Sequence, residues 1–208
     1  MSDDEAPPRY AIQIILTETA ARPLDNWANA AEGASVPTTG WHITLIPAFT
    51  LQGVDATLNE RLQAVADRHA LFELELSEIE ATTDSTRAGY HAVFLGCGPD
   101  AEDLCLPLYA LQAELAETLA PLRSNLQPEL GDRPFRPHIT LALSVSEQEA
   151  ARLAAFGRKQ QLRVRFEVAS FWLLKSSETE EGEVKTERQQ FVLAGANAAD
   201  QAAPDSLP

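Results

Sequence analysis

The tetrapeptide His-Ile-Thr-Leu occurs twice in this chain of 208 residues, each time in an apolar, strand-like setting. The first copy lies in WHITLIPAF at residues 41–49, and the second lies in RPHITLALS at residues 136–144. The sequence holds only four histidines, so chance is a poor explanation for two of them in one identical tetrapeptide. The repeat predicts two similar strands, one in each half of the chain.

Successive side chains of a strand point to opposite faces. His42 and Thr44 therefore share one face of the first strand, and His138 and Thr140 share one face of the second. The isoleucine and leucine of each copy point the other way and anchor the strand from behind. If the two halves face each other, two imidazoles and two hydroxyls converge on one cleft.

Such a set of side chains suits in-line chemistry at phosphorus without a metal. One neutral imidazole removes a proton from the attacking water or hydroxyl, and the other, protonated, gives a proton to the departing oxygen. An ordinary imidazole pKa of about 6.5 lets both forms coexist near neutral pH. The threonine hydroxyls can donate to the non-bridging phosphate oxygens, where charge gathers in the transition state. We therefore expect His42 and His138 as the catalytic acid/base pair and Thr44 and Thr140 as phosphate-binding residues.

Two other kinds of site are disfavoured. A zinc site lacks a third ligand at a sensible spacing, and a serine hydrolase would carry a GxSxG motif that is absent. No metal is expected.

The rest of the chain alternates strand and helix signals, with hairpin-like links that favour an α+β fold over a doubly wound parallel sheet. Capping boxes at Thr57-x-x-Glu60 and Ser146-x-x-Glu149 mark two helix starts. The expected strands are 10–17, 41–48, 71–79, 90–96, 138–143, 162–174 and 188–193. The expected helices are 21–33, 57–70 and 104–122, with a short one after Ser146. We expect one two-lobed domain over residues 9–194, with disordered tails at 1–8 and 195–208.

Composition narrows the partners and the compartment. A net charge of −15 repels long RNA or DNA but leaves room for a nucleotide-sized ligand in a locally positive pocket. No apolar run reaches the roughly 18–20 residues of a membrane span, and the acidic N-terminus is no secretory signal. The cytoplasm is the default expectation. Cys97 and Cys105 fit reduced, partly buried thiols best, with a single local disulfide as the alternative.

WHITL and PHITL resemble the paired His-x-Thr motifs of the two-histidine (2H) phosphoesterase superfamily, which includes 2′-5′ RNA ligase-like proteins and 2′,3′-cyclic phosphodiesterases. The resemblance runs from about Tyr10 to Leu193 and includes YHAVFLG and RPFRPHITL. The ending ASFWLLKSSETEEGEVKTERQQFVLAG is most similar to the cyclic phosphodiesterase branch. The resemblance implies a bilobal, pseudo-twofold fold of two mainly antiparallel sheets, with helices outside, a central cleft and no cofactor.

Five further side chains are weaker candidates for substrate binding. Arg136 can share the face of His138 and meet a phosphate, or lie in a solvent loop before the strand. Phe135 and Trp41 flank the motifs and can stack on a base, or fill the core and its rim. His91 can line the cleft or be structural, and Lys175 can meet an anion or be a surface lysine.

The leading hypothesis is a metal-independent cyclic phosphodiesterase that hydrolyses a nucleoside 2′,3′-cyclic phosphate or a related cyclic phosphodiester. Its ligand would be a small cyclic-phosphate nucleotide or a short RNA 3′ end. One alternative is RNA 2′-5′ ligation or RNA-end processing, against which the charge of −15 weighs. Another is a non-catalytic nucleotide- or phosphate-binding module, against which the intact His-x-Thr pairs argue.

Overall fold

The computed structural model describes most of the chain between Pro7 and Gly195. The described ranges are 7–34, 37, 39–52, 56–84, 87–98, 102–126, 134–178 and 183–195. The expected tail segments 1–6 and 196–208 lie outside them. The strands are β1 (Arg9–Ile15), β2 (His42–Leu51), β3 (Phe72–Leu76), β4 (Glu78–Thr83), β5 (His91–Gly96), β6 (Arg123–Asn125), β7 (His138–Val145), β8 (Val164–Val168), β9 (Ser170–Glu178) and β10 (Val184–Val192). The helices are α1 (Glu18–Ala30), α2 (Leu58–Arg68), α3 (Glu102–Leu119) and α5 (Glu147–Lys159).

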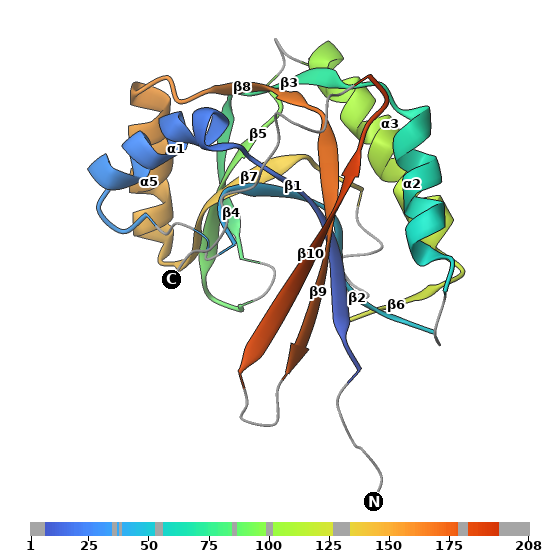
Figure 1. Cartoon of the computed structure of the whole chain (residues 1–208). Helices are drawn as coiled ribbons and strands as arrows, with labels where there is room; N and C mark the ends of the chain where they lie inside the picture. Colours follow the sequence, from blue (N-terminus) through green and yellow to red (C-terminus); the bar gives the residue numbers. More distant parts are fainter. Residues whose placement is uncertain are drawn as a thin grey trace, which may run out of the picture.

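An antiparallel sheet runs through the molecule in the strand order β10-β9-β1-β2-β7-β5-β4, with β6 added to the end of β2. A second, two-stranded sheet pairs β3 with β8. Helices α1 and α5 lie on one flank and α2 and α3 on the other (Figure 1). The expected α+β class is confirmed. The two halves are one sheet, joined where β2 and β7 pair at Ile43 and Ile139.

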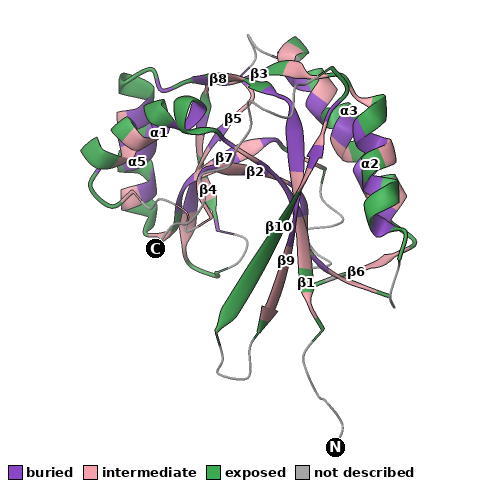
Figure 2. Cartoon of the chain, in the orientation of Figure 1, coloured by how far each residue is buried: buried purple, intermediate pink, exposed green. Residues whose placement is uncertain are grey.

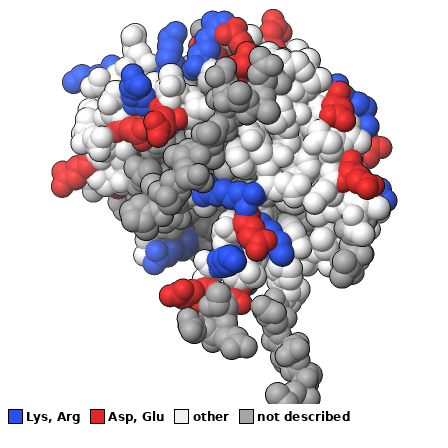
Figure 3. Space-filling model, in the orientation of Figure 1, with Lys and Arg blue, Asp and Glu red and all other residues white. Residues whose placement is uncertain are grey.

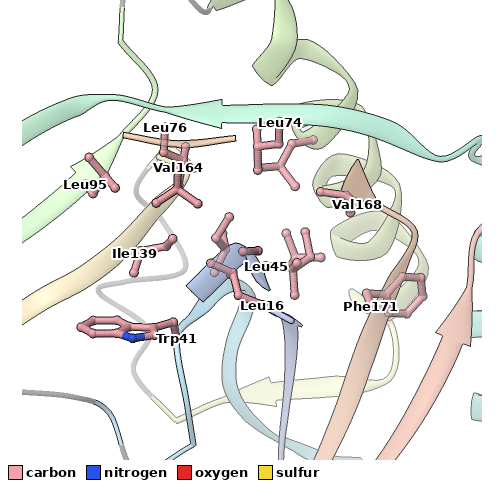
Figure 4. Packing of buried hydrophobic residues seen from close by; sticks show 14 of the residues in the cluster. Leu16, Trp41, Leu45, Leu74, Leu76, Leu95, Ile139, Val164, Val168 and Phe171 are labelled. Carbon is pink, nitrogen blue, oxygen red and sulfur yellow. The ribbon is translucent and has the colours of Figure 1, made fainter. Parts of the chain in front are cut away.

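The core lies on one face of this sheet, against the helices and the small sheet. Buried residues follow the strands through the middle of the molecule, and the hairpin of β9 and β10 extends into solvent (Figure 2). Leu45 from the first motif and Ile139 from the second point into the same apolar cluster as Leu76 and Val164 (Figure 4). The apolar residues of both motifs thus face the core, which directs the alternate residues to the other face.

Two expected strands each divide in two. The run 71–79 becomes β3 and β4, which are separated at Ser77, and the run 162–174 becomes β8 and β9, which are separated at Ala169. In both cases the first segment joins the small sheet and the second continues into the large one. The single-strand prediction was wrong because apolar alternation is the same in both segments. Which sheet a segment joins depends on its partner strand, and alternation does not record it.

The helix boundaries were partly predicted. Ser146 caps α5 as expected, since its Oγ accepts a hydrogen bond from the Glu149 amide at 3.2 Å. Thr57 makes no such bond, and its hydroxyl accepts from the Arg61 side chain instead, so that capping box is not formed. Helix α1 begins at Glu18, earlier than expected, because Thr17 caps it, and this places Pro23 inside the helix.

Cys97 and Cys105 form a disulfide, with their Cα atoms 6.5 Å apart, so the preference for reduced thiols was wrong. Cys97 follows β5 and Cys105 lies in the first turns of α3, so the bond joins the end of the strand to the start of the helix. The spacing of the two cysteines alone did not indicate that these two segments lie side by side. No described helix is long and apolar enough to cross a membrane.

Reduction of this disulfide is expected to lower the free energy of unfolding by about 2–3 kcal/mol, because a short closed loop limits the unfolded chain. Thermal unfolding with and without a reducing agent measures the effect. The double variant Cys97→Ala/Cys105→Ala should be insensitive to the reductant. An unchanged midpoint for the reduced wild type would contradict the prediction.

Candidate active site

The four motif residues lie on the open face of the sheet. Along β2, Ile43 and Leu45 are buried while His42 and Thr44 between them are half-buried. Strand β7 repeats this alternation, with His138 and Thr140 half-buried beside buried apolar neighbours. Each strand therefore presents one imidazole and one hydroxyl on the face away from the core.

Pairing between β2 and β7 places the two sets side by side. Ile43 is opposite Ile139 in antiparallel register. One residue further along in either direction, this register sets His42 against Thr140 and Thr44 against His138. Directly opposed residues share a face of the sheet. The two histidines thus form a diagonal pair across the junction of the halves, each beside the threonine of the other motif.

Both imidazoles are held in the same way. The Nδ1 atom of His42 lies 2.8 Å from the carbonyl oxygen of Gly40, and that of His138 lies 2.7 Å from the carbonyl oxygen of Arg136. A carbonyl can only accept, so each Nδ1 carries the proton. In its neutral form each ring therefore keeps an unprotonated Nε2 that can act as a base. Neither Nε2 hydrogen-bonds within the described part of the chain.

The pKa of both histidines lies below the ordinary imidazole value. Burial lowers the pKa of His42 most; the Gly40 carbonyl opposes the shift, and the charge of Arg188 adds to it. Burial also dominates the lowered pKa of His138, which is opposed by its carbonyl bond and by Glu80. The positive charges of Arg136 and of His42 lower the pKa of His138 further. The two rings are thus close enough to influence each other's protonation.

Phe94 on β5 completes the wall beside His138, and sequence reasoning missed it. Its ring centroid lies 4.2 Å from that of His138, with the planes tilted by 45°. Phe94 is opposite Thr140 in the pairing of β5 with β7, so it shares the face of the motif residues. The alternation of side chains along YHAVFLG predicts that Phe94 points away from the face of its buried neighbours Val93 and Leu95. Only the pairing of β5 with β7 shows that the Phe94 ring lies beside His138.

Arg188 on β10 is a second residue that sequence reasoning missed. It is opposite Leu174, two residues from Trp172 on the same face of the sheet, and its charge lowers the pKa of His42. Basic side chains surround an acidic group over the middle of the face formed by β9 and β10 (Figure 3). Arg188 therefore adds a positive charge near the first motif of a strongly acidic chain. The sequence around Arg188 contains no motif that would have indicated this position.

Asp84 and Ser144 fix the far end of β7. Ser144 has a φ of 56°, in the left-handed region, where the register between β5 and β7 shifts. Its backbone amide and its hydroxyl both donate to Oδ2 of the buried Asp84, each at 3.0 Å. Such a bulge sets the twist and direction of the strand that carries His138 and Thr140.

Trp41 and Phe135 belong to the core and its rim in this structure. Trp41 is 3% exposed, and its indole N–H donates to Asp25 at 2.7 Å. Phe135 is half-buried and packs edge-on against Tyr109 at 5.7 Å between centroids. Neither ring is brought beside the imidazoles by an observed contact.

Arg136 precedes β7, which starts at His138, and its guanidinium makes two hydrogen bonds to Glu80, at 2.7 and 2.8 Å. Its backbone carbonyl holds His138, and its exposed side chain acts on that imidazole through charge. The structure thus places Arg136 at the edge of the site with its guanidinium engaged by a carboxylate.

His91 and Lys175 lie away from the motif residues. His91 begins β5 opposite Val145, at the end of β7 remote from His138, and its buried Nδ1 has no hydrogen-bond partner among the described residues. Lys175 pairs with Tyr10 on the opposite face of the sheet, with its Nζ 3.5 Å from Glu187. It lines a cavity of about 650 Å³ between β9, β10 and the start of α2.

Among the residues that the structure describes, no group of three or more His, Cys, Asp or Glu side chains is arranged to hold a metal ion. The polar groups at the junction of β2 and β7 are imidazoles and hydroxyls. They can exchange protons and donate hydrogen bonds to an anion.

This arrangement of paired His-x-Thr strands on an antiparallel sheet is matched by a known family. A match to the 2′-5′ RNA ligase superfamily spans residues 17–180 and covers both motifs. The chain belongs to this superfamily of two-histidine phosphoesterases. The resemblance seen in the sequence is thereby confirmed.

Several solved structures share the fold. LigT of E. coli, in complex with 3′-AMP, is 20% identical with a TM-score of 0.54, over 91% of this chain and 99% of that one. A structure described as a phosphoesterase is 20% identical with a TM-score of 0.55, over 90% and 99%. TT0787 of Thermus thermophilus is 19% identical with a TM-score of 0.50, over 91% and 100%. No curated protein matches the sequence.

Proposed function

We propose that this protein hydrolyses a 2′,3′-cyclic phosphate on a nucleoside or a closely related cyclic phosphodiester, with His42 and His138 as the acid/base pair. The main support for the proposal is that both imidazole rings are held by the same kind of hydrogen bond. Each Nδ1 donates to a carbonyl two residues upstream, so each Nε2 is left to exchange protons. General acid and general base of this kind act together in substitution at phosphorus.

The reaction consumes one water. One neutral imidazole takes a proton from this water through Nε2 while the water oxygen forms a bond to phosphorus. The bond between phosphorus and one ribose oxygen breaks, and the other, protonated imidazole gives that oxygen its proton. The product is a monophosphate ester with a free neighbouring hydroxyl, and one imidazole has gained the proton that the other has lost. Exchange with solvent restores the pair.

Thr44 and Thr140 supply hydrogen bonds to the non-bridging oxygens. The β2–β7 register sets each threonine beside the histidine of the other strand, so both hydroxyls border the space between the rings. Donors placed where negative charge develops lower the barrier most, because they need no reorganisation during the reaction. Arg188 adds positive charge on the same face of the sheet, which favours an anionic substrate.

Small nucleotides are the ligands seen in relatives of similar fold. LigT has been solved with 3′-AMP and with NADP⁺. A nucleotide-sized substrate also agrees with the net charge of −15, which repels a long polyanion. The proposal therefore names a cyclic-phosphate mononucleotide or a short RNA 3′ end.

Phosphorus NMR on a panel of nucleoside 2′,3′-cyclic monophosphates, with EDTA present, tests the proposal. We expect the cyclic phosphate resonance to disappear and one monophosphate resonance to replace it. Its position identifies which ribose oxygen leaves. If the wild type leaves the whole panel unchanged, the proposal is wrong. RNA fragments with suitable ends, included in parallel, would then show whether the protein forms a 2′-5′ link.

The pH dependence follows from the lowered pKa of both histidines. The free enzyme needs one ring protonated and the other neutral, so kcat/KM should pass through a maximum between the two pKa values. Both values lie below the ordinary one, and we expect this maximum on the acid side of about pH 6.5. Bound phosphate favours imidazolium, so the maximum in kcat should lie at higher pH. Initial rates from about pH 5 to 8 measure both profiles, and a flat kcat/KM profile would contradict the mechanism.

A further inference from the structure

Gln13 on β1 is a buried polar side chain without a partner among the described residues. It is only 9% exposed, and its Oε1 is buried with no hydrogen bond. Buried amides are normally paired, because an unpaired one loses its bonds to water and gains nothing in return. Gln190, on the same face, shows the usual case, since its amide donates to Ser170 at 3.0 Å. Gln13 therefore calls for a separate explanation.

The strand register places Gln13 next to the active site. Gln13 is directly opposite Thr44 on one side and directly opposite Trp172 on the other. Directly opposed residues share a face, so all three lie on the face that carries His42. Neighbouring strands are about 4.8 Å apart. Gln13 is thus one strand from the phosphate-binding hydroxyl, and Trp172 is two strands, or about 10 Å, from it.

Trp172 differs from the other two tryptophans. Trp27 and Trp41 are 4% and 3% exposed, whereas Trp172 is half-buried on the open face. A partly exposed indole beside a charged site offers a flat surface on which an aromatic ring can stack. The row from Thr44 through Gln13 to Trp172 therefore offers a hydroxyl, an amide and an aromatic ring in that order.

We propose that Gln13 and Trp172 form the subsite for the nucleobase of a nucleotide whose phosphate lies between His42 and His138. This rests on the proposed function. The base stacks on Trp172, and the amide of Gln13 turns toward the edge of the base. A glutamine amide carries both a donor and an acceptor and can form two hydrogen bonds with a base edge. The ribose then lies over β1, between Trp172 on β9 and the phosphate site beside Thr44 on β2.

Kinetics with two substrates test the subsite. One is a nucleoside 2′,3′-cyclic phosphate, and the other is glycerol 1,2-cyclic phosphate, which has the five-membered cyclic ester without a base. For the nucleoside substrate we expect KM to rise about 3–10-fold in Gln13→Met and about 10-fold or more in Trp172→Leu, with little change in kcat. The preference for the nucleoside over the glycerol substrate should fall by the same factor.

Gln189→Met is the matched control. It makes the same substitution at an exposed glutamine of β10 that lies on the face of the sheet opposite to Trp172. Its KM for both substrates should equal that of the wild type. Equal losses on both substrates in Gln13→Met would overturn the proposal, since they would mean damage to the phosphate site. An unchanged KM for the nucleoside substrate would overturn it as well.

Thermal unfolding separates a binding role from a structural one. Gln13→Met replaces an unpaired amide by an apolar group of similar shape, so the unfolding midpoint should rise while nucleotide binding weakens. A lower midpoint would show that the amide supports the fold, against the proposal.

Tryptophan fluorescence tests the subsite even if the proposed reaction fails. If the wild type hydrolyses neither cyclic phosphate, the proposed function is wrong, but stacking can still be measured. Titration with AMP should quench the emission of Trp172, and Trp172→Phe should remove this quenching. Absence of quenching in the wild type would overturn the subsite. Quenching with no hydrolysis would support the subsite and indicate a binding role.

Discussion

His42→Ala and His138→Ala are each expected to lower kcat for a nucleoside 2′,3′-cyclic phosphate by about 10²–10⁴-fold, because each variant loses one of the two proton transfers. The double variant should be little worse than either single one, since the two rings act in one step. Single-turnover rates followed by phosphorus NMR, beside substrate binding by calorimetry, measure the effect. We expect binding to weaken far less than turnover.

Two controls keep this result interpretable. His69→Ala removes a histidine that follows α2 and whose Nε2 lies 2.7 Å from Glu114 on α3. Its kcat should stay close to that of the wild type. Thermal unfolding of the His42 and His138 variants should show folded proteins. Full activity in either folded variant would rule out the paired mechanism.

Asp84→Ala is expected to destabilise the fold by about 3–4 kcal/mol. The substitution removes the acceptor for both the amide and the hydroxyl of Ser144, and hydrogen bonds to a charged group contribute about 1.5–3 kcal/mol each. It also leaves a residue at a φ of 56° without its support. Denaturant unfolding measures the loss, and kcat should fall as well, because Ser144 lies near the end of the strand that carries His138.

Asp84→Asn keeps an acceptor oxygen of the same size, so it should lose clearly less stability than Asp84→Ala. Glu78→Ala, at an exposed carboxylate on β4, should stay within about 0.5 kcal/mol of the wild type. If Asp84→Ala were as stable as Glu78→Ala, the bulge would hold without its carboxylate and the prediction would be wrong.

The sequence was sufficient to put the His and Thr side chains of each motif on one face of its strand, because the information needed is local. Alternation within two short strands places His42 and Thr44 on one face, and the repeat of the tetrapeptide indicates a second, similar strand. The α+β class followed from the order of the elements in the same way. The family resemblance rested on these motifs, and the match over residues 17–180 confirms it.

What sequence reasoning missed depends on contacts between strands far apart in the chain. Phe94 matters because β5 lies beside β7, and Arg188 matters because β10 lies on the same sheet as β2. The carbonyl that holds His42 is a local exception, because it comes from Gly40, two residues upstream, whose φ of 81° is accessible to glycine without strain. The spacing of residues within the motifs does not show which strands lie next to each other in the sheet. The disulfide between Cys97 and Cys105 was missed for a different reason, since it joins two neighbouring elements and the spacing of the cysteines does not show that they meet.

The strand order has a consequence for synthesis on the ribosome. Strands β4, β5 and β7 are neighbours in the sheet and follow one another in the middle of the chain, so all three are available to pair once β7 has been made. Strand β1 is made first, yet one of its edges pairs with β9, which is made almost last. Through most of translation this edge is therefore an open template for other chains. We expect a chaperone that shields this edge of β1 until β9 has been made to reduce association between unfinished chains.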